Sequence, residues 1–247
     1  MMLANANDLA TRQPHQVPAD ATVQPPIRRP VRSIRVEQLV KEYQTPIGVR
    51  RVLDGISFEL HEGEKIAVLG RNGSGKSTLM KLIGGVEFPT SGVVHRDLAL
   101  SWPMGSNGGV TGYMTGAASA RFIARLYNRD EREVLESVDD FAELGRQLYI
   151  PIEAYSSGMR ARLQFALSLA IDFECYLIDE ILAVGDQRFH RKCYDALFVK
   201  RANRAMIMVS HDQNAVRNFC RSALVLKAGR GRVFKDLELA LRIYETL

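Results

Sequence analysis

The sequence is poor in cysteine and contains no long uninterrupted apolar run. Its three cysteines, Cys175, Cys193 and Cys220, lie far apart and form no C-x-x-C pair, so neither a zinc site nor a disulfide framework is indicated. No apolar stretch approaches the roughly 20 residues of a membrane-spanning helix, and the N-terminus lacks a charged start followed by an apolar segment. Because no disulfide framework is indicated, we expect a protein of a reduced compartment. If a membrane is involved, another chain must supply the spanning helices.

No strong excess of either charge is present. Lys and Arg number 33 against 28 Asp and Glu, which gives a formal net charge of +5. The densest basic group consists of Arg28, Arg29, Arg32 and Arg35. Such a group is typical of a solvated linker and also of a surface for anionic lipid or nucleic acid, so we assign it no function. With 46% hydrophobic and 25% charged residues among 247, the composition indicates one globular domain with a sizeable core.

The chain divides into a polar N-terminal segment and a folded body. Residues 1–33 are rich in Ala, Pro, Gln, Asn and Thr. We expect them to be disordered, because they have too few large apolar side chains to offset the entropy of ordering. Residues 34–247 are expected to form one α/β domain, in which strands alternate with helices around a mostly parallel sheet. A helical insert is expected inside this frame, at about residues 112–172.

Hydrophobic periodicity predicts the individual elements. The expected strands cover residues 34–39, 56–60, 65–69, 93–95, 98–100, 175–178, 206–209 and 223–226. The expected helices cover residues 76–83, 117–127, 131–144, 157–171, 215–219 and 237–247. No internal repeat or heptad array is present, which excludes a solenoid and a coiled coil.

A glycine-rich loop joins the third expected strand to the first expected helix. It matches the full phosphate-binding pattern with the residues Gly70, Arg71, Asn72, Gly73, Ser74, Gly75, Lys76 and Ser77, followed by Thr78. Glycines let consecutive backbone N–H groups curl around phosphate oxygens, and the helix N-terminus adds the positive end of its dipole. In such a loop Lys76 reaches the β and γ phosphates, and the Ser77 hydroxyl is a ligand for Mg²⁺. The sequence therefore predicts a site for ATP with Mg²⁺.

Two carboxylates end the expected strand at residues 175–178. In a parallel sheet, ligands bind at the carboxyl ends of the strands, where Asp179 and Glu180 stand. We expect Asp179 to hold Mg²⁺ through a water, and Glu180 to polarise the water that attacks the γ-phosphate. The alternative, a pair of helix N-cap residues, is disfavoured by the complete phosphate loop about a hundred residues earlier.

A third motif precedes the long expected helix at residues 157–171. With its segment Ser156, Ser157, Gly158 and Met159, the chain resembles the ATP-binding subunits of ABC transporters over nearly everything from residue 34 onward. The resemblance implies a P-loop NTPase core with a mostly parallel sheet, an antiparallel β subdomain and an inserted helical subdomain. It also implies a homodimer in which this segment binds the γ-phosphate of ATP held by the opposite subunit. A serine N-cap without a ligand is the alternative reading of the segment.

Three further positions are carried over from the resemblance. Tyr43 is similar to the aromatic residue on which adenine stacks, although a core tyrosine near a strand end is the alternative. Residues 183–186, ending in Asp186, are similar to the loop that crosses the dimer interface. His211 is similar to the switch histidine that contacts the γ-phosphate.

One position departs from the family pattern. ABC subunits normally place a glutamine before the helical insert, where it touches Mg²⁺ and water, but no glutamine lies between Gln44 and Gln147. The best match is Thr111, whose shorter side chain implies slower hydrolysis or looser coupling to a permease. A tenfold slowing corresponds to only about 1.4 kcal/mol of lost transition-state stabilisation.

Within the family, residues 101–103, 155–163 and 176–189 resemble the subunits that power capsular polysaccharide export. This resemblance implies a peripheral protein on the cytoplasmic face of the inner membrane, paired with an integral membrane permease. Periplasmic and outer-membrane export proteins would be indirect partners, and no nucleic acid would be bound. Two alternatives stay open: a soluble ABC-type ATPase acting on nucleic acid or the ribosome, and a nucleotide-binding regulator that hydrolyses ATP poorly.

Overall fold

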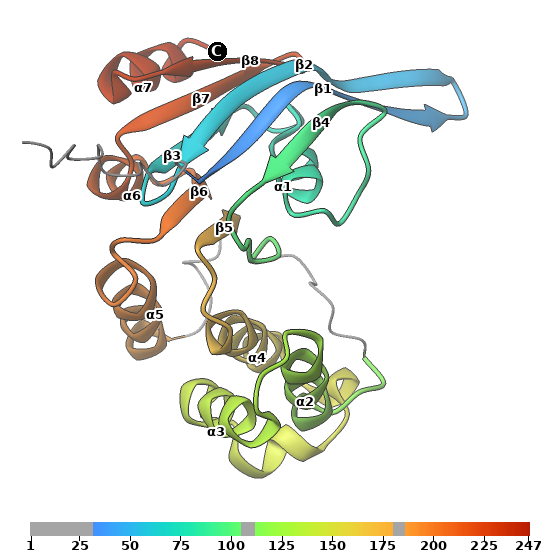
Figure 1. The fold of residues 1–247 in the computed structure, drawn as a ribbon, viewed down its shortest axis with the longest axis vertical. Helices are drawn as coiled ribbons and strands as arrows, with labels where there is room; N and C mark the ends of the chain where they lie inside the picture. The colour runs from blue at the N-terminus through green and yellow to red at the C-terminus, as the bar shows by residue number, and fades with distance from the viewer. Residues whose placement is uncertain (1–31, 105–111, 180–185) are drawn as a thin grey trace, which may run out of the picture. The chain divides into compact units, whose positions relative to one another are not determined.

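The computed structural model describes residues 32–104, 112–179 and 186–247, in which the strands form two sheets (Figure 1). The first sheet is antiparallel, in the order β2-β1-β4, and comprises β1 (Ser33–Thr45), β2 (Gly48–His61) and β4 (Ser91–Arg96). The second has the order β5-β6-β3-β7-β8 and comprises β3 (Lys65–Gly70), β5 (Cys175–Asp179), β6 (Ala205–Val209), β7 (Ser222–Lys227) and β8 (Arg230–Phe234). The expected α/β architecture with a separate antiparallel sheet is confirmed.

Parallel pairing around β3 organises the larger sheet. β3 pairs in parallel with β6 and β7, and β6 pairs in parallel with β5, while β8 runs antiparallel to β7. Because β6 lies between β3 and β5, the carboxyl ends of these strands meet at one edge of the sheet. This edge therefore carries both Gly70 and Asp179, the last residues of β3 and β5.

Both faces of β3 are buried, which explains its continuous apolar sequence. Ala67 and Leu69 belong to a core cluster shared with the helical insert, whereas Ile66 and Val68 belong to a second cluster shared with the antiparallel sheet. The second cluster also contains the apolar side of α1 (Lys76–Ile83). Helix α1, which follows the glycine-rich loop, is thus packed between the two sheets (Figure 1).

The helical insert contains α2 (Gly116–Leu126), α3 (Glu131–Ala142), the 3-10 turns Gly145–Tyr149 and Ile152–Ala154, and α4 (Ser157–Ala170). Side chains of Thr115, Asp130 and Ser156 accept backbone N–H bonds at the starts of the three α-helices, which sets where each begins. The Phe141 ring of α3 stacks on Phe165 of α4 with centroids 5.7 Å apart. Helix α4 also shares a core cluster with β3 and β5, and this packing holds it against the large sheet.

The last part of the chain completes the fold. It contains α5 (Gln187–Tyr194), which continues into a π-helical turn at Asp195–Val199, then α6 (Gln213–Phe219) and α7 (Leu237–Glu245). No helix among the described residues is long and apolar enough to cross a membrane. The segment expected to be disordered covers residues 1–33, and of these, residues 1–31 lie outside the described residues. The disorder of this segment and the limits of the domains therefore stay predictions.

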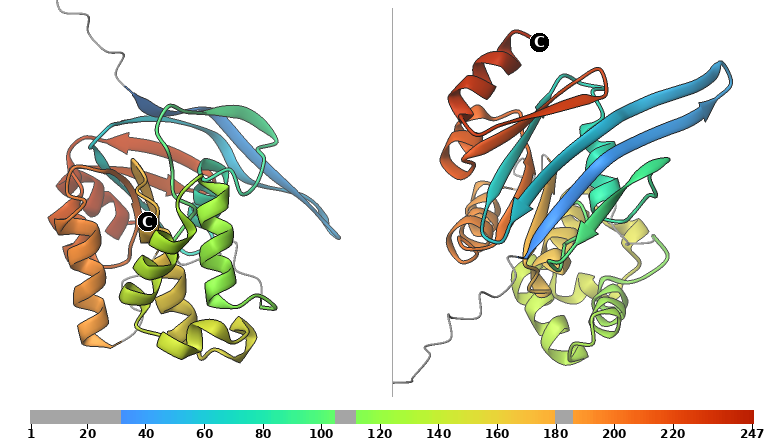
Figure 2. Two further views of the ribbon diagram at one scale, coloured as in Figure 1. Left: turned by 60° about the horizontal axis from the view of Figure 1, so that its bottom comes forward. Right: turned by 45° about the horizontal axis from the view of Figure 1, so that its top comes forward.

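The structure corrects several expected elements. The expected strand at residues 98–100 is wrong: only Leu100 makes an isolated bridge, to Cys175, because the carboxylate of Glu174 takes the Ala99 N–H. β1 and β2 run far beyond residues 34–39 and 56–60 as a long hairpin, drawn in blue in Figure 2. β8 and α5 were not expected. The polar sequence of β8 has no strand periodicity, and only its ladder with β7 makes it a strand.

The buried cysteines give a test of the packed core. Burial raises the pKa of Cys193 and of Cys220 to about 12, and raises that of Cys175 as well. At pH 8 only about one thiol in ten thousand would then be ionised, and thiolate is the reactive form. We expect none of the three thiols to react with a maleimide within minutes in the native protein, and all three to react in guanidinium. The Ser91→Cys variant, altered at an exposed position, serves as the positive control; rapid labelling of the unaltered native protein would contradict the described packing.

Candidate functional site

The glycine-rich loop connects the end of β3 to the start of α1, as expected. Gly73 and Gly75 have φ angles of +80° and +104°, which side-chain-bearing residues rarely adopt. The Lys76 side chain turns back over the loop, and its Nζ donates to the carbonyl oxygens of Gly70 at 2.8 Å and Arg71 at 3.3 Å. Lys76 is only 9% exposed, so a positive charge is held in place beside the loop's N–H groups. Such a cradle is suited to an anion.

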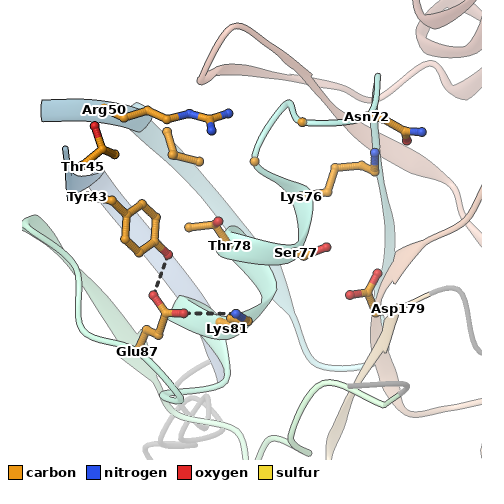
Figure 3. A pocket seen from close by; sticks show the side chains of 13 residues that line it. Tyr43, Thr45, Arg50, Asn72, Lys76, Ser77, Thr78, Lys81, Glu87 and Asp179 are labelled. Carbon is orange, nitrogen blue, oxygen red and sulfur yellow. Dashed lines mark hydrogen bonds and ion pairs between the residues drawn. The ribbon is translucent and has the colours of Figure 1, made fainter. Parts of the chain in front are cut away.

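A cavity of about 870 Å³ opens in front of this loop (Figure 3). Its wall includes eight of the predicted residues: Tyr43, Asn72, Gly73, Gly75, Lys76, Ser77, Thr78 and Asp179. These come from β1, from the loop with α1, and from β5, so three distant parts of the sequence meet here. Of the other predicted loop residues, Gly70, Arg71 and Ser74 form the loop without lining the cavity.

The acidic end of the cavity is built from two oxygen-bearing side chains. The Ser77 hydroxyl at the start of α1 and the Asp179 carboxylate at the end of β5 point toward one another (Figure 3). Oxygen donors of this kind fit Mg²⁺, which binds through one or two protein ligands together with phosphate and water. Among the described residues, no cluster of three or more His, Cys, Asp or Glu could hold a metal alone. The predicted residues Glu180 and Thr111 lie outside the described residues.

The segment Ser156–Met159 lies apart from the cavity, at the start of α4. The Ser156 hydroxyl accepts the Met159 N–H at 3.2 Å, which is the N-cap arrangement. Ser156 and Ser157 are exposed, and none of the four residues lines the cavity of its own chain. An exposed helix start with unused N–H groups is compatible with the prediction that this segment serves another subunit.

Asp186 has a structural role that sequence reasoning missed. Its carboxylate caps α5 by accepting the Phe189 N–H at 2.9 Å, and it accepts an Arg162 bond at 2.6 Å. The backbone bond from Phe189 is the main cause that lowers the pKa of Asp186, and Arg162 acts in the same direction. Arg162 lies on α4, two turns after Ser156, so an ion pair joins α4 to the loop predicted to cross a dimer interface. Residues 183–185 of that loop lie outside the described residues.

His211 follows β6 and does not line the cavity. Its Nδ1 lies 3.3 Å from the hydroxyl of Tyr244 on α7. Two residues after His211, the Gln213 side chain donates to Glu245, which also lies on α7. The last residue of the chain also reaches the site, since the Arg71 guanidinium donates to the Leu247 carbonyl at 3.2 Å. The end of the chain therefore contacts both the glycine-rich loop and the predicted switch histidine, which no motif indicated.

Sequence reasoning missed five residues of the cavity wall: Thr45, Arg50, Val52, Lys81 and Glu87. They belong to the β1–β2 hairpin, to the end of α1 and to the segment after it. None is part of a motif, and only the pairing of β1 with β2 brings Arg50 opposite Tyr43.

Comparison with known proteins identifies the family. The sequence model of the ABC transporter family matches residues 53–183, which include the glycine-rich loop, the Ser156–Met159 segment and Asp179. The chain belongs to the ABC transporter family. This ABC protein therefore carries the three predicted motifs within the matched region.

Its relatives include the capsule polysaccharide export ATP-binding protein CtrD of Neisseria meningitidis, which is 50% identical over 87% of this chain and 99% of that protein. The ATP-binding protein BexA of Haemophilus influenzae is also 50% identical, over 85% of this chain and 97% of its own length. Among solved structures, a dimeric ATP-binding cassette bound to ADP and Pi in a post-hydrolysis state superposes with a TM-score of 0.69. That cassette is 21% identical, with 81% of this chain and 97% of that chain covered, and it supports the fold.

Two glycines of the loop give a matched test of the phosphate cradle. A Cβ on Gly75 would come within 2.7 Å of Leu53 Cδ2 and 3.1 Å of the Val52 carbonyl, whereas a Cβ on Gly73 would meet nothing within 4 Å. Both substitutions strain the backbone, by on the order of 1–3 kcal/mol, because both glycines have positive φ angles. Only Gly75→Ala also crowds Leu53 and the Val52 carbonyl, so that the loop or these neighbours must shift. We expect Gly75→Ala to weaken binding of inorganic tripolyphosphate by at least about tenfold more than Gly73→Ala, measured by calorimetry. Equal losses in the two variants would show that crowding at Gly75 does not matter, and unchanged binding in both would contradict the phosphate cradle.

Proposed function

We propose that this chain is the ATP-hydrolysing subunit of an exporter of capsular polysaccharide. The observation that carries the proposal is the cavity in which the phosphate loop faces Asp179, in a chain 50% identical to the capsule polysaccharide export protein CtrD and to the ATP-binding protein BexA, each over nearly its whole length. Those relatives favour an exporter over a soluble ABC ATPase acting on nucleic acid or ribosomes. The rate of ATP hydrolysis by the purified protein distinguishes this exporter subunit from a nucleotide-binding regulator that hydrolyses ATP poorly.

Nucleotide binding follows from the positions of the wall residues. The loop N–H groups and the buried Lys76 ammonium bind the phosphates, while Tyr43, at the other end of the cavity, stacks on the adenine. Ser77 and Asp179 hold Mg²⁺, Asp179 through a water; the ion, when bound, neutralises charge on the β and γ phosphates. Glu180 follows Asp179 in sequence, and we assign it the polarisation of the attacking water. His211 lies outside the cavity wall, and we assign it the contact with the γ-phosphate from the family resemblance alone.

Two copies of the chain complete each site. The Ser156–Met159 segment begins with two exposed serines and does not line its own cavity, so the N–H groups of Ser157 and Gly158 at this helix start can bind the γ-phosphate held by the other copy. Asp186, fixed by Arg162, would then place the preceding loop across the interface. Closure on two ATP molecules and reopening after hydrolysis supply the motion that drives transport.

Transport requires a second polypeptide that spans the membrane. We propose an integral membrane permease as the direct partner, with this chain peripheral on the cytoplasmic face of the inner membrane. Periplasmic and outer-membrane export proteins would be indirect partners. We infer that Thr111 is the best match to the position at which ABC subunits normally have glutamine. Its hydroxyl reaches less far, so we expect hydrolysis to be slower or coupled more loosely to the permease.

The phosphate-binding role of Lys76 is tested by removing its charge. We expect Lys76→Ala to reduce ATP binding by at least about 100-fold, because several charge-assisted hydrogen bonds to phosphate are lost together. Calorimetric titration with Mg-ATP measures the loss, and circular dichroism checks the fold. Lys200→Ala, which removes a charge at an exposed position outside the cavity, should bind like the original protein. ATP binding by Lys76→Ala at unchanged affinity would contradict the assignment of the cavity.

The dimer and the general base are tested together by Glu180→Gln. We expect this variant to bind Mg-ATP, to lose hydrolysis by at least about 100-fold, and to accumulate as a closed dimer. Light scattering after gel filtration, with and without Mg-ATP, measures the dimer. Adding Lys76→Ala to the same chain should abolish dimerisation. Normal turnover by Glu180→Gln would remove this residue as the base, and a monomer at saturating Mg-ATP would contradict the two-copy mechanism.

A further inference from the structure

The end of the cavity that faces away from the glycine-rich loop contains a short hydrogen bond between two side chains. The Tyr43 hydroxyl on β1 donates to Glu87 Oε2 at 2.6 Å (Figure 3). Burial raises the pKa of Tyr43, and the bond to Glu87 adds to the rise. The same bond is the main cause that lowers the pKa of Glu87, with Lys81 acting in the same direction. At neutral pH a carboxylate therefore accepts from a neutral phenol.

Glu87 is itself held from two sides. Lys81 Nζ lies 3.2 Å from its Oε1, and Lys41 Nζ lies 3.5 Å from its Oε2. Both carboxylate oxygens thus have a cationic partner, which limits rotation of the side chain. The two ammonium groups also offset the negative charge of Glu87, so a carboxylate is tolerated in the wall of a cavity that takes phosphates.

Lys41 fixes the Tyr43 ring in a second way. Its Nζ lies 4.9 Å from the ring centroid and donates to the Phe88 carbonyl at 2.8 Å. Its side chain is 15% exposed, and Lys41 does not line the cavity, whereas Tyr43 does. The lysine therefore covers the ring from outside the cavity. The ring itself belongs to the cavity wall, where a ligand can contact it.

We propose that Glu87 is a positioning residue for nucleotide binding, which holds the Tyr43 ring in the orientation that stacks on the base. This inference rests on the proposed function, and it adds a residue that does not touch the ligand's reacting atoms. A ring already fixed before binding loses less conformational freedom when the base arrives, and this raises affinity. The ion pair with Lys81 also ties the ring to α1, the helix that begins with Lys76 and Ser77.

The proposal predicts that Tyr43 and Glu87 act as one unit. We expect Tyr43→Phe and Glu87→Ala each to weaken ATP binding by about fivefold, the range for one hydrogen bond, and the double variant to weaken it by about the same factor. Independent effects would multiply to about 25-fold in the double variant. Glu87→Gln keeps an oxygen that accepts from the phenol, so its affinity should stay within about twofold of the original.

Inorganic tripolyphosphate separates a base-specific effect from a general one. It carries the phosphates without the base, so we expect all three single variants and the double variant to bind it with unchanged affinity. Glu37→Ala is the matched control: it removes an ion-paired carboxylate from the same strand as Tyr43, outside the cavity, and should bind ATP normally. Thermal unfolding of each variant checks that the fold is retained.

Different results would overturn the role of Glu87 and the binding of ATP. Multiplicative losses in the double variant, unchanged ATP binding by Glu87→Ala, or an equal loss of tripolyphosphate binding would overturn the role of Glu87 while leaving ATP binding in place. Failure of the unaltered protein to bind ATP at all would instead overturn the proposed function, and the role of Glu87 with it.

Discussion

The parallel ladder of β3, β6 and β5 is the constraint on which the site depends. Its register pairs Lys65 with Met206 and Met206 with Tyr176, so the carboxyl ends of β3 and β5 stay at a fixed separation across β6. Gly70 and Asp179 end these strands, and the phosphate loop and the acidic side chain are placed by the sheet itself. Because each strand is buried on both faces, a shift of one residue would move apolar side chains out of two core clusters at once.

Buried charge at this edge is stabilised by the backbone. Lys76 is nearly covered, yet its ammonium keeps two carbonyl partners, so the cost of desolvation is offset before any ligand is present. In the proposed function, an arriving phosphate would meet a cation that is already placed. Preorganisation of this kind puts the cost of ordering into folding and leaves more of the interaction energy for binding.

Ion pairs join segments of the protein that are separate in the sequence. Arg162 on α4 contacts Glu143 after α3 and Asp186 before α5, and Lys192 on α5 contacts the same Glu143. The helix start proposed to serve the opposite subunit is thereby linked to the loop proposed to cross the interface. In the cavity wall, the pairs around Glu87 link the antiparallel sheet to α1. Single exposed pairs contribute little to stability, but shared partners give these networks a defined geometry.

The sequence by itself determined the phosphate loop, the strand ending in Asp179, the α/β class and the helices of the insert. These depend on short patterns whose physical causes are local: glycines that permit positive φ, caps that start helices, and apolar periodicity. The tertiary structure alone decided that Glu87, Lys81 and Arg50 belong to the cavity, that Asp186 caps α5, and that Tyr244 reaches His211. It also made a strand of β8 and removed the expected one at residues 98–100. For the cavity wall and the His211 contact, the partner comes from a distant part of the chain, and only folding brings the two together. The Asp186 cap and the β7–β8 ladder join near neighbours in the sequence, and there the polar sequence carried no apolar periodicity to indicate the element.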